Sequence, residues 1–575
     1  MPSPQPTAPG PSRRLRLWPG VVAVIAMWIA RFGIKLVVPG FDGFSRAMMT
    51  SFVCAGLVLL WWLFFSRAAW IERLGGLVVL AGGLAGTWWL RDESAGPVWL
   101  LGYVVPVLWL TFVGWAVLTR NLPDRTRRLY LVATVLGTCG AWLMFRTSGV
   151  DGDHDSSFAW RWAKTAEERL LEASGDGSGV AAPMGTSDAP ASSSEWPGFR
   201  GPGRDGVARS MAISTDWSAT PPQELWRRPV GPGWSSFAVR GEVLYTQEQR
   251  GADEVVSCYS LATGQEVWLH RDPVRFFESN AGAGPRGTPT LEGDTVYSFG
   301  ATGILNALDA SNGTVRWSRD VARDSDVGVP EWGFSSSPLV VDDLVVVAAS
   351  GRLMAYGRGT GELRWQGEKG GVSYSSPQLA WLDGTRQVVL MHGRGILGVE
   401  PAGGAVLWQH DWPGFPMVQP ELTGDGDILV SASQSAGVRR LAITRDDDTW
   451  QAEERWTSLR LKPYFNHFVI HDGHAYGFDG RILAAIDLTS GERRWKGGRF
   501  GNGQMILLPE QDLLLVLSEK GQIALVSATP EEFRELGRVS ALDGKTWNHP
   551  VLVGDVLLVR NAEEMAAYRL AAGDA

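Results

Sequence analysis

The chain has 575 residues and a formal net charge of −8 at pH 7. That length exceeds one ordinary domain, and the negative charge gives no electrostatic support to a nucleic-acid partner. The mean hydropathy of -0.04 averages two unlike parts, because the first quarter is strongly apolar and the remainder is polar and rich in glycine and tryptophan. Three cysteines without a CxxC pair argue against a zinc site or a redox dithiol.

The apolar part predicts a membrane anchor. A helix that crosses a bilayer needs roughly 20 mostly apolar residues. Five segments approach this pattern, namely 17–38, 47–65, 74–90, 98–118 and 129–145. The first carries Arg31 and Lys35 in its last third, where both side chains could reach the outer surface. We therefore expect a cytoplasmic Pro/Arg-rich tail over residues 1–16 and five transmembrane helices over residues 17–145.

The basic residues of the short loops predict the orientation. Nine arginines lie on the side of the N-terminus, at positions 13, 14, 16, 67, 73, 120, 125, 127 and 128, and fewer lie on the other side. Because cytoplasmic loops carry the excess of basic residues, the N-terminus is expected inside and the C-terminal part in the periplasm. The chain would then be a multi-pass protein of the cytoplasmic (inner) membrane. Spans two to five hold no charge at their middles, which favours an anchor, although a quinone groove with apolar walls stays open.

Residues 146–194 predict an extracytoplasmic connector. Thr165 and Glu168 have the spacing of a capping box before an apolar pair, so one short helix is expected there. From residue 173 onward the connector is rich in glycine, serine, alanine and proline, which is typical of a flexible linker.

An internal repeat follows from residue 195. Five segments end in a tryptophan that a glycine precedes by four positions, as in NALDASNGTVRW, which ends at Trp317, and AAIDLTSGERRW, which ends at Trp495. Successive repeat tryptophans lie 39 to 49 residues apart. Each unit reads as two hairpins with tight glycine turns, and repeats of this length with four strands are typical of a β-propeller.

The two ends of the repeat region predict how the ring closes. Two further units follow Trp495, and the last of them lacks its own tryptophan strand. An extra strand around Trp226 precedes the first complete unit and could supply the missing one, which would remove a free sheet edge. A solenoid is the competing repeat fold, but it needs no such complementary ends. The expected fold is therefore a five-helix transmembrane bundle followed, over residues 195–575, by an eight-bladed propeller with four-stranded antiparallel blades.

The repeat endings, together with EWPGFRGPGRDG at 195–206, resemble the pyrroloquinoline-quinone (PQQ) repeat, and the resemblance extends to about residue 570. It implies one of two kinds of protein. Quinoprotein dehydrogenases hold PQQ and Ca²⁺ in the propeller funnel, whereas the propeller lipoprotein of outer-membrane protein assembly is a non-catalytic binder. The layout of five spans and an external propeller is also similar to that of the membrane-bound glucose dehydrogenases, which reduce a membrane quinone.

The resemblance implies where a site would lie. The funnel of such a propeller is lined by the residues just before each innermost strand, and here these segments hold aromatic, amide and charged side chains. Glu278 and Asn280 are the candidate Ca²⁺ ligands, and Glu331 is the candidate catalytic base. The candidate cofactor-binding residues are Arg286, Trp332, Tyr374, Lys462, His467, Lys545, Trp547 and His549.

Two functions follow from these patterns. The first is a membrane-anchored binding or assembly module for a protein or glycan partner. It is favoured by the lack of a vicinal Cys-Cys pair and of a partner aspartate in the funnel, and by compact blades of about 47 residues. The second is a PQQ-dependent dehydrogenase that oxidises a sugar or alcohol and reduces a membrane quinone, and the layout and the polar funnel favour it. The sequence does not name the ligand, the substrate or the oligomeric state.

Overall fold

The computed structural model describes residues 15–37, 40–152, 155–174, 195–209, 212–447 and 449–573. The chain forms two compact units: Met1–Ala163 with Ser279–Gly282, and Lys164–Glu278 with Ala283–Ala575. Most of the predicted tail, residues 1–14, and most of the predicted linker, residues 175–194, lie outside the described residues.

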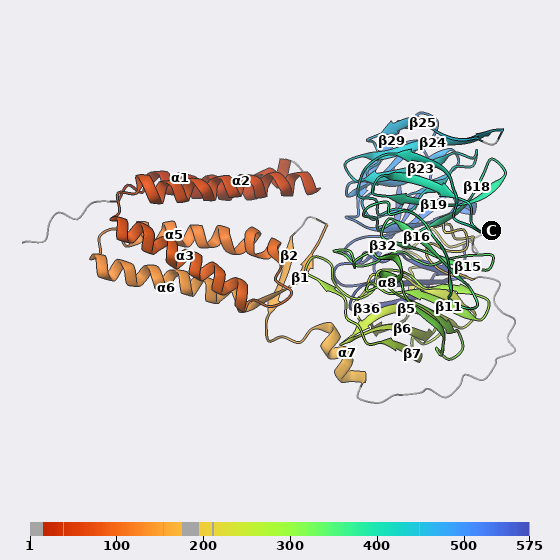
Figure 1. Cartoon of the computed structure of the whole chain (residues 1–575), viewed down its shortest axis with the longest axis horizontal. Helices are drawn as coiled ribbons and strands as arrows, with labels where there is room; N and C mark the ends of the chain where they lie inside the picture. The colour runs from red at the N-terminus through yellow and green to blue at the C-terminus, as the bar shows by residue number, and fades with distance from the viewer. Residues whose placement is uncertain are drawn as a thin grey trace, which may run out of the picture. The chain divides into compact units, whose positions relative to one another are not determined.

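The first unit contains five helical segments, which lie side by side in Figure 1. They are α1 (Trp18–Val37), α2 (Gly40–Leu60) with η1 (Trp61–Phe65), α3 (Trp70–Leu90), α4 (Pro97–Trp99) with η2 (Leu100–Val104) and α5 (Val105–Leu118), and α6 (Asp124–Trp142). Three spans, Gly43–Phe65, Trp70–Leu90 and Pro97–Leu118, are long and apolar enough to cross a membrane. Among the described residues, length and apolar composition thus fit three of the five predicted membrane-crossing helices, and the crossing itself stays a prediction. The apolar part of α1 is shorter, and α6 begins with a charged run.

Tryptophans and one buried ion pair hold these helices together. Trp62 contacts Phe112 and Trp115 edge to face at ring-centroid distances of 5.0 and 5.7 Å. Glu72 is buried with Arg127, and the two side chains form a salt bridge. A buried carboxylate needs such a partner, so α3 and α6 are joined by charge as well as by apolar packing.

Two short elements follow the helices. Strands β1 (Phe145–Val150) and β2 (Ser156–Trp160) pair antiparallel. Helix α7 (Ala166–Ser174) opens on a capping box, because Thr165 N donates to Glu168 Oε2 at 2.6 Å and Glu168 N donates to Thr165 Oγ1 at 2.9 Å. The short helix predicted from that spacing is confirmed.

The second unit is an eight-bladed propeller whose blades are four-stranded antiparallel sheets. Its strands are coloured from yellow-green to blue in Figure 1. Four blades are β4 (Ala238–Arg240), β5 (Val243–Arg250), β6 (Asp253–Ser260), β7 (Glu266–Asp272); β10 (Thr290–Glu292), β11 (Thr295–Phe299), β12 (Ile304–Asp309), β13 (Val315–Asp320); β14 (Leu339–Val341), β15 (Leu344–Ala349), β16 (Arg352–Gly357), β17 (Leu363–Gln366); and β18 (Gln378–Leu382), β19 (Thr385–His392), β20 (Gly395–Val399), β21 (Val406–Asp411).

The other blades close the ring. They are β22 (Glu421–Leu422), β23 (Ile428–Ser433), β24 (Gly437–Asp446), β25 (Thr449–Ser458); β26 (Val469–His471), β27 (His474–Asp479), β28 (Ile482–Asp487), β29 (Arg493–Arg499); β30 (Gln504–Leu508), β31 (Leu513–Leu517), β32 (Gln522–Ser527), β33 (Glu535–Ser540); and β34 (Val551–Val553), β35 (Val556–Arg560), β36 (Glu564–Arg569), β3 (Gln223–Pro229). Smaller elements are β8 (Phe277–Glu278), β9 (Gly282–Ala283), α8 (Val321–Ser325) and η3 (Pro509–Gln511). Strand β3 pairs antiparallel with β36, so the predicted closure by N- and C-terminal strands is confirmed.

The core lies between neighbouring blades, because both faces of each sheet are covered. Val345 and Val347 of β15 pack with Phe299, whereas the alternate residue Val346 packs with Val388 and its neighbours on the other side. Successive strand residues point to opposite faces, which explains why the middle strands are continuous apolar runs.

The glycine of one repeat packs against the tryptophan of the preceding repeat, across the boundary between two blades. Gly361 has a φ of +66°, and a Cβ there would lie 2.6 Å from the Trp317 ring of the preceding blade. Trp317 Nε1 donates to Arg358 O in the same turn at 2.9 Å. The same packing recurs between Gly264 and Trp226, Gly313 and Trp268, Gly404 and Trp365, and Gly491 and Trp456. Glycine is therefore needed both for the turn conformation and for the close approach of the ring.

Candidate functional site

A layer of buried polar residues surrounds the propeller axis. One residue at or just before each innermost strand belongs to it, namely Ser236, Thr288, Ser337, Ser376, Gln419, His467, Gln504 and His549, and all eight are buried. The side chain of one blade accepts from the backbone of its neighbour: Ser236 N donates to Thr288 Oγ1 at 2.9 Å, and Thr288 N donates to Ser337 Oγ at 3.0 Å. Buried backbone groups need such partners, so this layer ties blade to blade.

His467 and His549, two of the predicted cofactor-binding residues, belong to this layer. His549 Nε2 lies 3.2 Å from His467 Nδ1, and His467 Nε2 accepts from Gln419 N at 3.1 Å. Burial lowers the pKa of both imidazoles well below the ordinary value, and the nearby Arg200 charge adds to the shift. Both side chains are therefore neutral at pH 7 and offer no positive charge to a cofactor carboxylate.

The segment 195–206 occupies the axis next to this layer. The Phe199 ring contacts the His467 and His549 rings at centroid distances of 5.3 and 5.1 Å. Arg200 is buried, forms an ion pair with Glu421 and donates to Phe468 O at 2.8 Å. Arg204 donates to Pro338 O at 2.9 Å.

These contacts fill the centre of the ring with the protein's own side chains. Phe199, Arg200 and Arg204 have no place among the residues predicted from the sequence. Two arginines in a segment dense in glycine and proline are the signal that could have pointed to them.

The loops before the innermost strands also carry two aromatic clusters. In the first, Trp332 contacts Tyr374 at 5.1 Å and Phe415 at 5.3 Å, and Tyr374 contacts Phe415 at 5.2 Å. We call Trp332, Tyr374 and Phe415 the first aromatic cluster. Tyr374 is buried, Trp332 is partly exposed, and Phe415 is 36% exposed. The cluster therefore has a buried base and an exposed rim.

The second aromatic cluster consists of Trp234, Phe465 and Trp547. Trp547 contacts Trp234 at 4.7 Å and Phe465 at 4.9 Å. Lys545 Nζ lies 4.5 Å from the Trp547 ring centroid and 5.3 Å from that of Trp234. Trp547 Nε1 donates to Glu519 Oε1 at 2.8 Å. A cation held over two rings, with the rings only partly buried, gives this cluster a positive tip on an apolar base.

The predicted charged residues are already paired or lie apart. Arg286 Nη2 lies 3.3 Å from Glu278 Oε1, and Arg286 Nε donates to Trp332 O at 3.3 Å. Burial lowers the pKa of Arg286 to about 10. Glu331 is exposed, and Lys462 forms a β-bridge with Asp479 through its backbone. Asn280 groups with the first unit, where its carbonyl accepts from Val150 N at 2.7 Å.

This arrangement does not fit PQQ with Ca²⁺ in the way the sequence implied. The Glu278 carboxylate has Arg286 beside it. Trp332 and Trp547 pack against neighbouring rings. Cavities of about 250 and 290 Å³ occur among the described residues, and none of the predicted site residues lines either.

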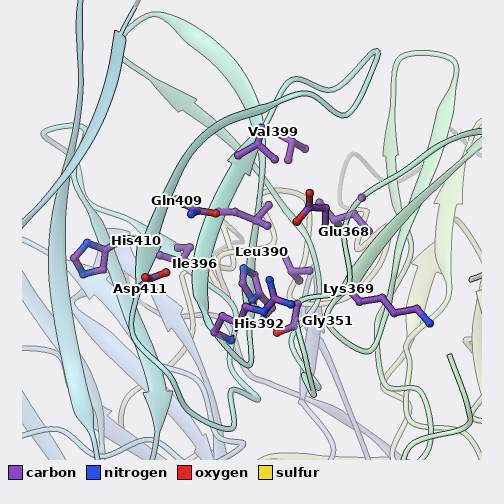
Figure 2. Close-up of a pocket in the computed structure, with 16 residues that line it drawn as sticks. Gly351, Glu368, Lys369, Leu390, His392, Ile396, Val399, Gln409, His410 and Asp411 are labelled. Atoms are coloured by element: carbon purple, nitrogen blue, oxygen red, sulfur yellow. Dashed lines mark hydrogen bonds between the residues drawn. The ribbon is translucent and has the colours of Figure 1, made fainter.

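The cavity of about 250 Å³ lies between the blade β14–β17 and the blade β18–β21 (Figure 2). His392 is buried in it beside Leu390, and its Nδ1 lies 3.0 Å from Gly370 O. Burial lowers the pKa of His392. The wall also contains Glu368, His410 and Asp411. Among the described residues these side chains do not form a group whose ligand atoms lie close enough together to hold a metal ion.

One group of described residues could hold a metal ion. It comprises His471, Asp472 and Asp512, whose ligand atoms lie within 4.8 Å of one another. Both carboxylates are exposed, and His471 Nε2 lies 2.6 Å from Asp512 Oδ1. An imidazole paired with an exposed carboxylate accounts for this geometry without a metal.

Comparison with known proteins shows which propellers this chain is similar to. A family described as outer membrane protein assembly factor BamB matches residues 214–328 and 252–497. The chain is 24% identical over 360 residues to BamB of Yersinia pestis, which covers 60% of this chain and 77% of that protein. It is 31% identical over 156 residues to BamB of Shewanella oneidensis, which covers 25% of this chain and 36% of that protein.

A solved structure supports the fold alone. The quinohemoprotein alcohol dehydrogenase of Comamonas testosteroni superposes with a TM-score of 0.50 at 12% identity, over 67% of this chain and 81% of that chain. The second unit is an eight-bladed β-propeller whose repeats are similar to the PQQ repeat. Among the proteins of that class, its sequence is similar to BamB.

Proposed function

We propose that this chain is a membrane-anchored, extracytoplasmic binding propeller that holds a protein partner during envelope assembly. The observation that carries the proposal is the pair of aromatic clusters in the loops before the innermost strands, beside an axis filled by Arg200 and Phe199. The first cluster has an exposed ring, and the rings of the second are partly exposed. Aromatic side chains with apolar bases dominate the binding energy of protein interfaces. The relatives named as outer membrane protein assembly factors support the same choice.

The anchor in this proposal comprises all five helical segments, with residues 1–16 in the cytoplasm, 17–145 in the inner membrane, 146–194 as connector and 195–575 as periplasmic propeller. The charges at the start of α6 do not oppose this, because Arg127 and Arg128 both reach Glu72 of α3. Paired charges near a helix end cost far less in a membrane than a lone charge at its centre. Cysteine labelling from each side of intact membranes at residues 120 and 162 tests the orientation, and equal labelling from both sides at either position would refute it.

Site-directed photo-crosslinking tests the binding face. A benzoylphenylalanine placed at Phe415 and, separately, at Trp234 should cross-link a denatured β-barrel outer-membrane protein that is diluted into the full chain in nanodiscs. Trp381 is the control, because it is 63% exposed but lies at the far end of β18. Adducts at Trp381 equal to those at the two aromatic clusters would refute a specific face.

The alternative is a PQQ-dependent dehydrogenase that oxidises a sugar or alcohol and reduces a membrane quinone, and the layout of helices followed by a propeller favours it. Titration of the full chain with PQQ and Ca²⁺, read by tryptophan fluorescence, separates the two functions. Saturable quenching that needs Ca²⁺ and is lost in Glu278→Gln would support the enzyme. Quenching that is absent, or that Glu278→Gln and Arg286→Ala leave unchanged, would support the binding module.

A further inference from the structure

The first unit contains a cavity of about 290 Å³ with one cation in its wall. Three helical segments and the residue before β2 contribute to it. The lining residues are Trp28, Arg31, Phe32, Gly102, Tyr103, Pro106, Val107, Trp142 and Asp155. The cavity is thus mainly aromatic and aliphatic, with Arg31 and Asp155 as its charged groups.

Arg31 is buried, and among the described residues it forms no salt bridge. Its side chain belongs to a residue that is only 6% exposed, and its guanidinium carbon lies 4.8 Å from the Tyr103 ring centroid. Its other close polar contact is with Met48 Sδ at 3.8 Å. Among the described residues, no Asp or Glu oxygen lies within the 4.0 Å of a salt bridge to Arg31. Tyr103 hydrogen-bonds to Arg31, and Asp155 in the same wall attracts it from beyond salt-bridge distance. A buried cation whose counter-charge does not contact it is only partly compensated, so the guanidinium donors can take an anion that comes from outside the chain.

The local backbone makes room for that guanidinium. Gly102 lies in the π-helical turn η2, and a Cβ there would be in ordinary contact with Arg31 Nη2, at 3.6 Å. Single π-helical turns inside α-helices occur frequently at functional sites. A larger residue at position 102 would take the space in front of the Arg31 donors.

The depth of Arg31 indicates the source of the anion. Arg31 lies six residues before the end of α1 at Val37, which is roughly 9 Å along a helix. The aromatic rings of Phe145, Trp160 and Trp162 stack in the same unit at centroid distances of 4.8 and 5.0 Å, and stacked tryptophans are typical of the membrane–water interface. With the N-terminus inside, this end of α1 is at the level of the outer-leaflet headgroups.

We propose that this cavity binds the headgroup of an outer-leaflet phospholipid, with the phosphate on Arg31 and an amine toward Asp155. Arginine binds phosphate through several fixed donors. The Asp155 carboxylate in the same wall disfavours a second negative charge, so a zwitterionic headgroup such as phosphatidylethanolamine fits better than phosphatidylglycerol. The inference rests on the part of the proposed function that places α1 in the membrane.

Native mass spectrometry of the full chain in detergent tests the site. One phosphatidylethanolamine per chain should bind to the wild type, and Arg31→Gln should weaken binding about tenfold or more. Arg46→Gln, which removes an exposed arginine from α2, should leave binding unchanged. Gly102→Leu should block the site while Arg31 stays in place. Gly114→Leu is its matched control, because a Cβ at Gly114 meets no atom within 4 Å.

Further binding measurements identify the chemical class of the ligand. Equal binding to the wild type and Arg31→Gln would overturn the site, and tighter binding of phosphatidylglycerol than of phosphatidylethanolamine would overturn the zwitterionic headgroup. Glycerophosphoethanolamine or inorganic phosphate that binds as well as the lipid would show a soluble phosphate ester as the ligand. Failure here is distinguishable from failure of the proposed function, because cysteine labelling reports insertion independently of any bound lipid.

Discussion

The polar layer at the axis and the aromatic clusters come from the same short loops. The layer residues are polar and buried, whereas most rings of the clusters are at least partly exposed. In the segment 545–549, Lys545 and Trp547 belong to the second aromatic cluster, whereas His549 belongs to the buried layer. In the segment 462–467, Phe465 contacts Trp547 while His467 faces His549. Of two residues two positions apart in such a loop, one thus packs inside the propeller and the other is in contact with solvent. The comparison teaches that depth along the axis decides the role of a residue in these loops.

The largest expected effect comes from breaking the filled axis. Arg200→Ala should lower the free energy of unfolding of the propeller by about 3–5 kcal/mol, because it leaves the buried Glu421 carboxylate without its partner. Arg209→Ala, at an arginine whose side chain is 63% exposed, should change stability by less than about 0.5 kcal/mol. Chemical denaturation followed by tryptophan fluorescence measures both. A loss below about 1 kcal/mol for Arg200→Ala would contradict a structural axis.

A smaller loss of unfolding free energy is expected for changes at the blade boundaries, where the side chains only hold neighbouring blades together. Gly361→Ala should destabilise the propeller by about 1–3 kcal/mol, because the residue has a φ of +66° and its Cβ would meet the Trp317 ring. Gly359→Ala in the same turn meets no atom within 4 Å and should be near neutral. Thermal unfolding of the two variants side by side gives the answer, and similar values for both would show that ring and glycine do not constrain each other.

Most of the propeller could be predicted because its signals are local and repeat. The Trp-to-Trp spacing predicted the blades, and the unpaired strand around Trp226 predicted the closure. The aromatic, amide and charged residues of the candidate loops could also be predicted. The sequence did not predict which of them belong to the buried polar layer and which to the aromatic clusters. That division depends on contacts such as Arg200 with Glu421, which are 221 residues apart. No local pattern reports a pair so distant. Glu278 and Arg286 are only eight residues apart, but a list of residue types does not report that their side chains lie beside each other.

The contribution of the buried layer to stability should also depend on pH, whereas that of the aromatic clusters should not. Because the folded-state pKa values of His467 and His549 are lowered, the unfolded chain binds more protons once the pH falls below about 6.5. Their contribution to stability is therefore complete above that pH and is lost as the pH falls, by up to about 1.4 kcal/mol per pH unit for each histidine. Denaturation at pH 7.5 and pH 5 should show a smaller difference for His549→Asn than for the wild type. His474→Asn, at the partly exposed first residue of β27, is the control for the loss of an imidazole outside the buried layer.

The smallest effect on stability belongs to the rim of the first aromatic cluster, and there the effect on binding should be greatest. Phe415→Ser removes a ring that is 36% exposed, so it should cost only about 0.5–1 kcal/mol of unfolding free energy. The same change should reduce cross-linking from position 234 to the denatured β-barrel protein at least severalfold, because one partner segment would contact both clusters. A variant that loses stability but keeps its cross-linking would show that Phe415 stabilises the fold rather than binds a partner. The first aromatic cluster would then have the same structural role as the polar layer at the axis.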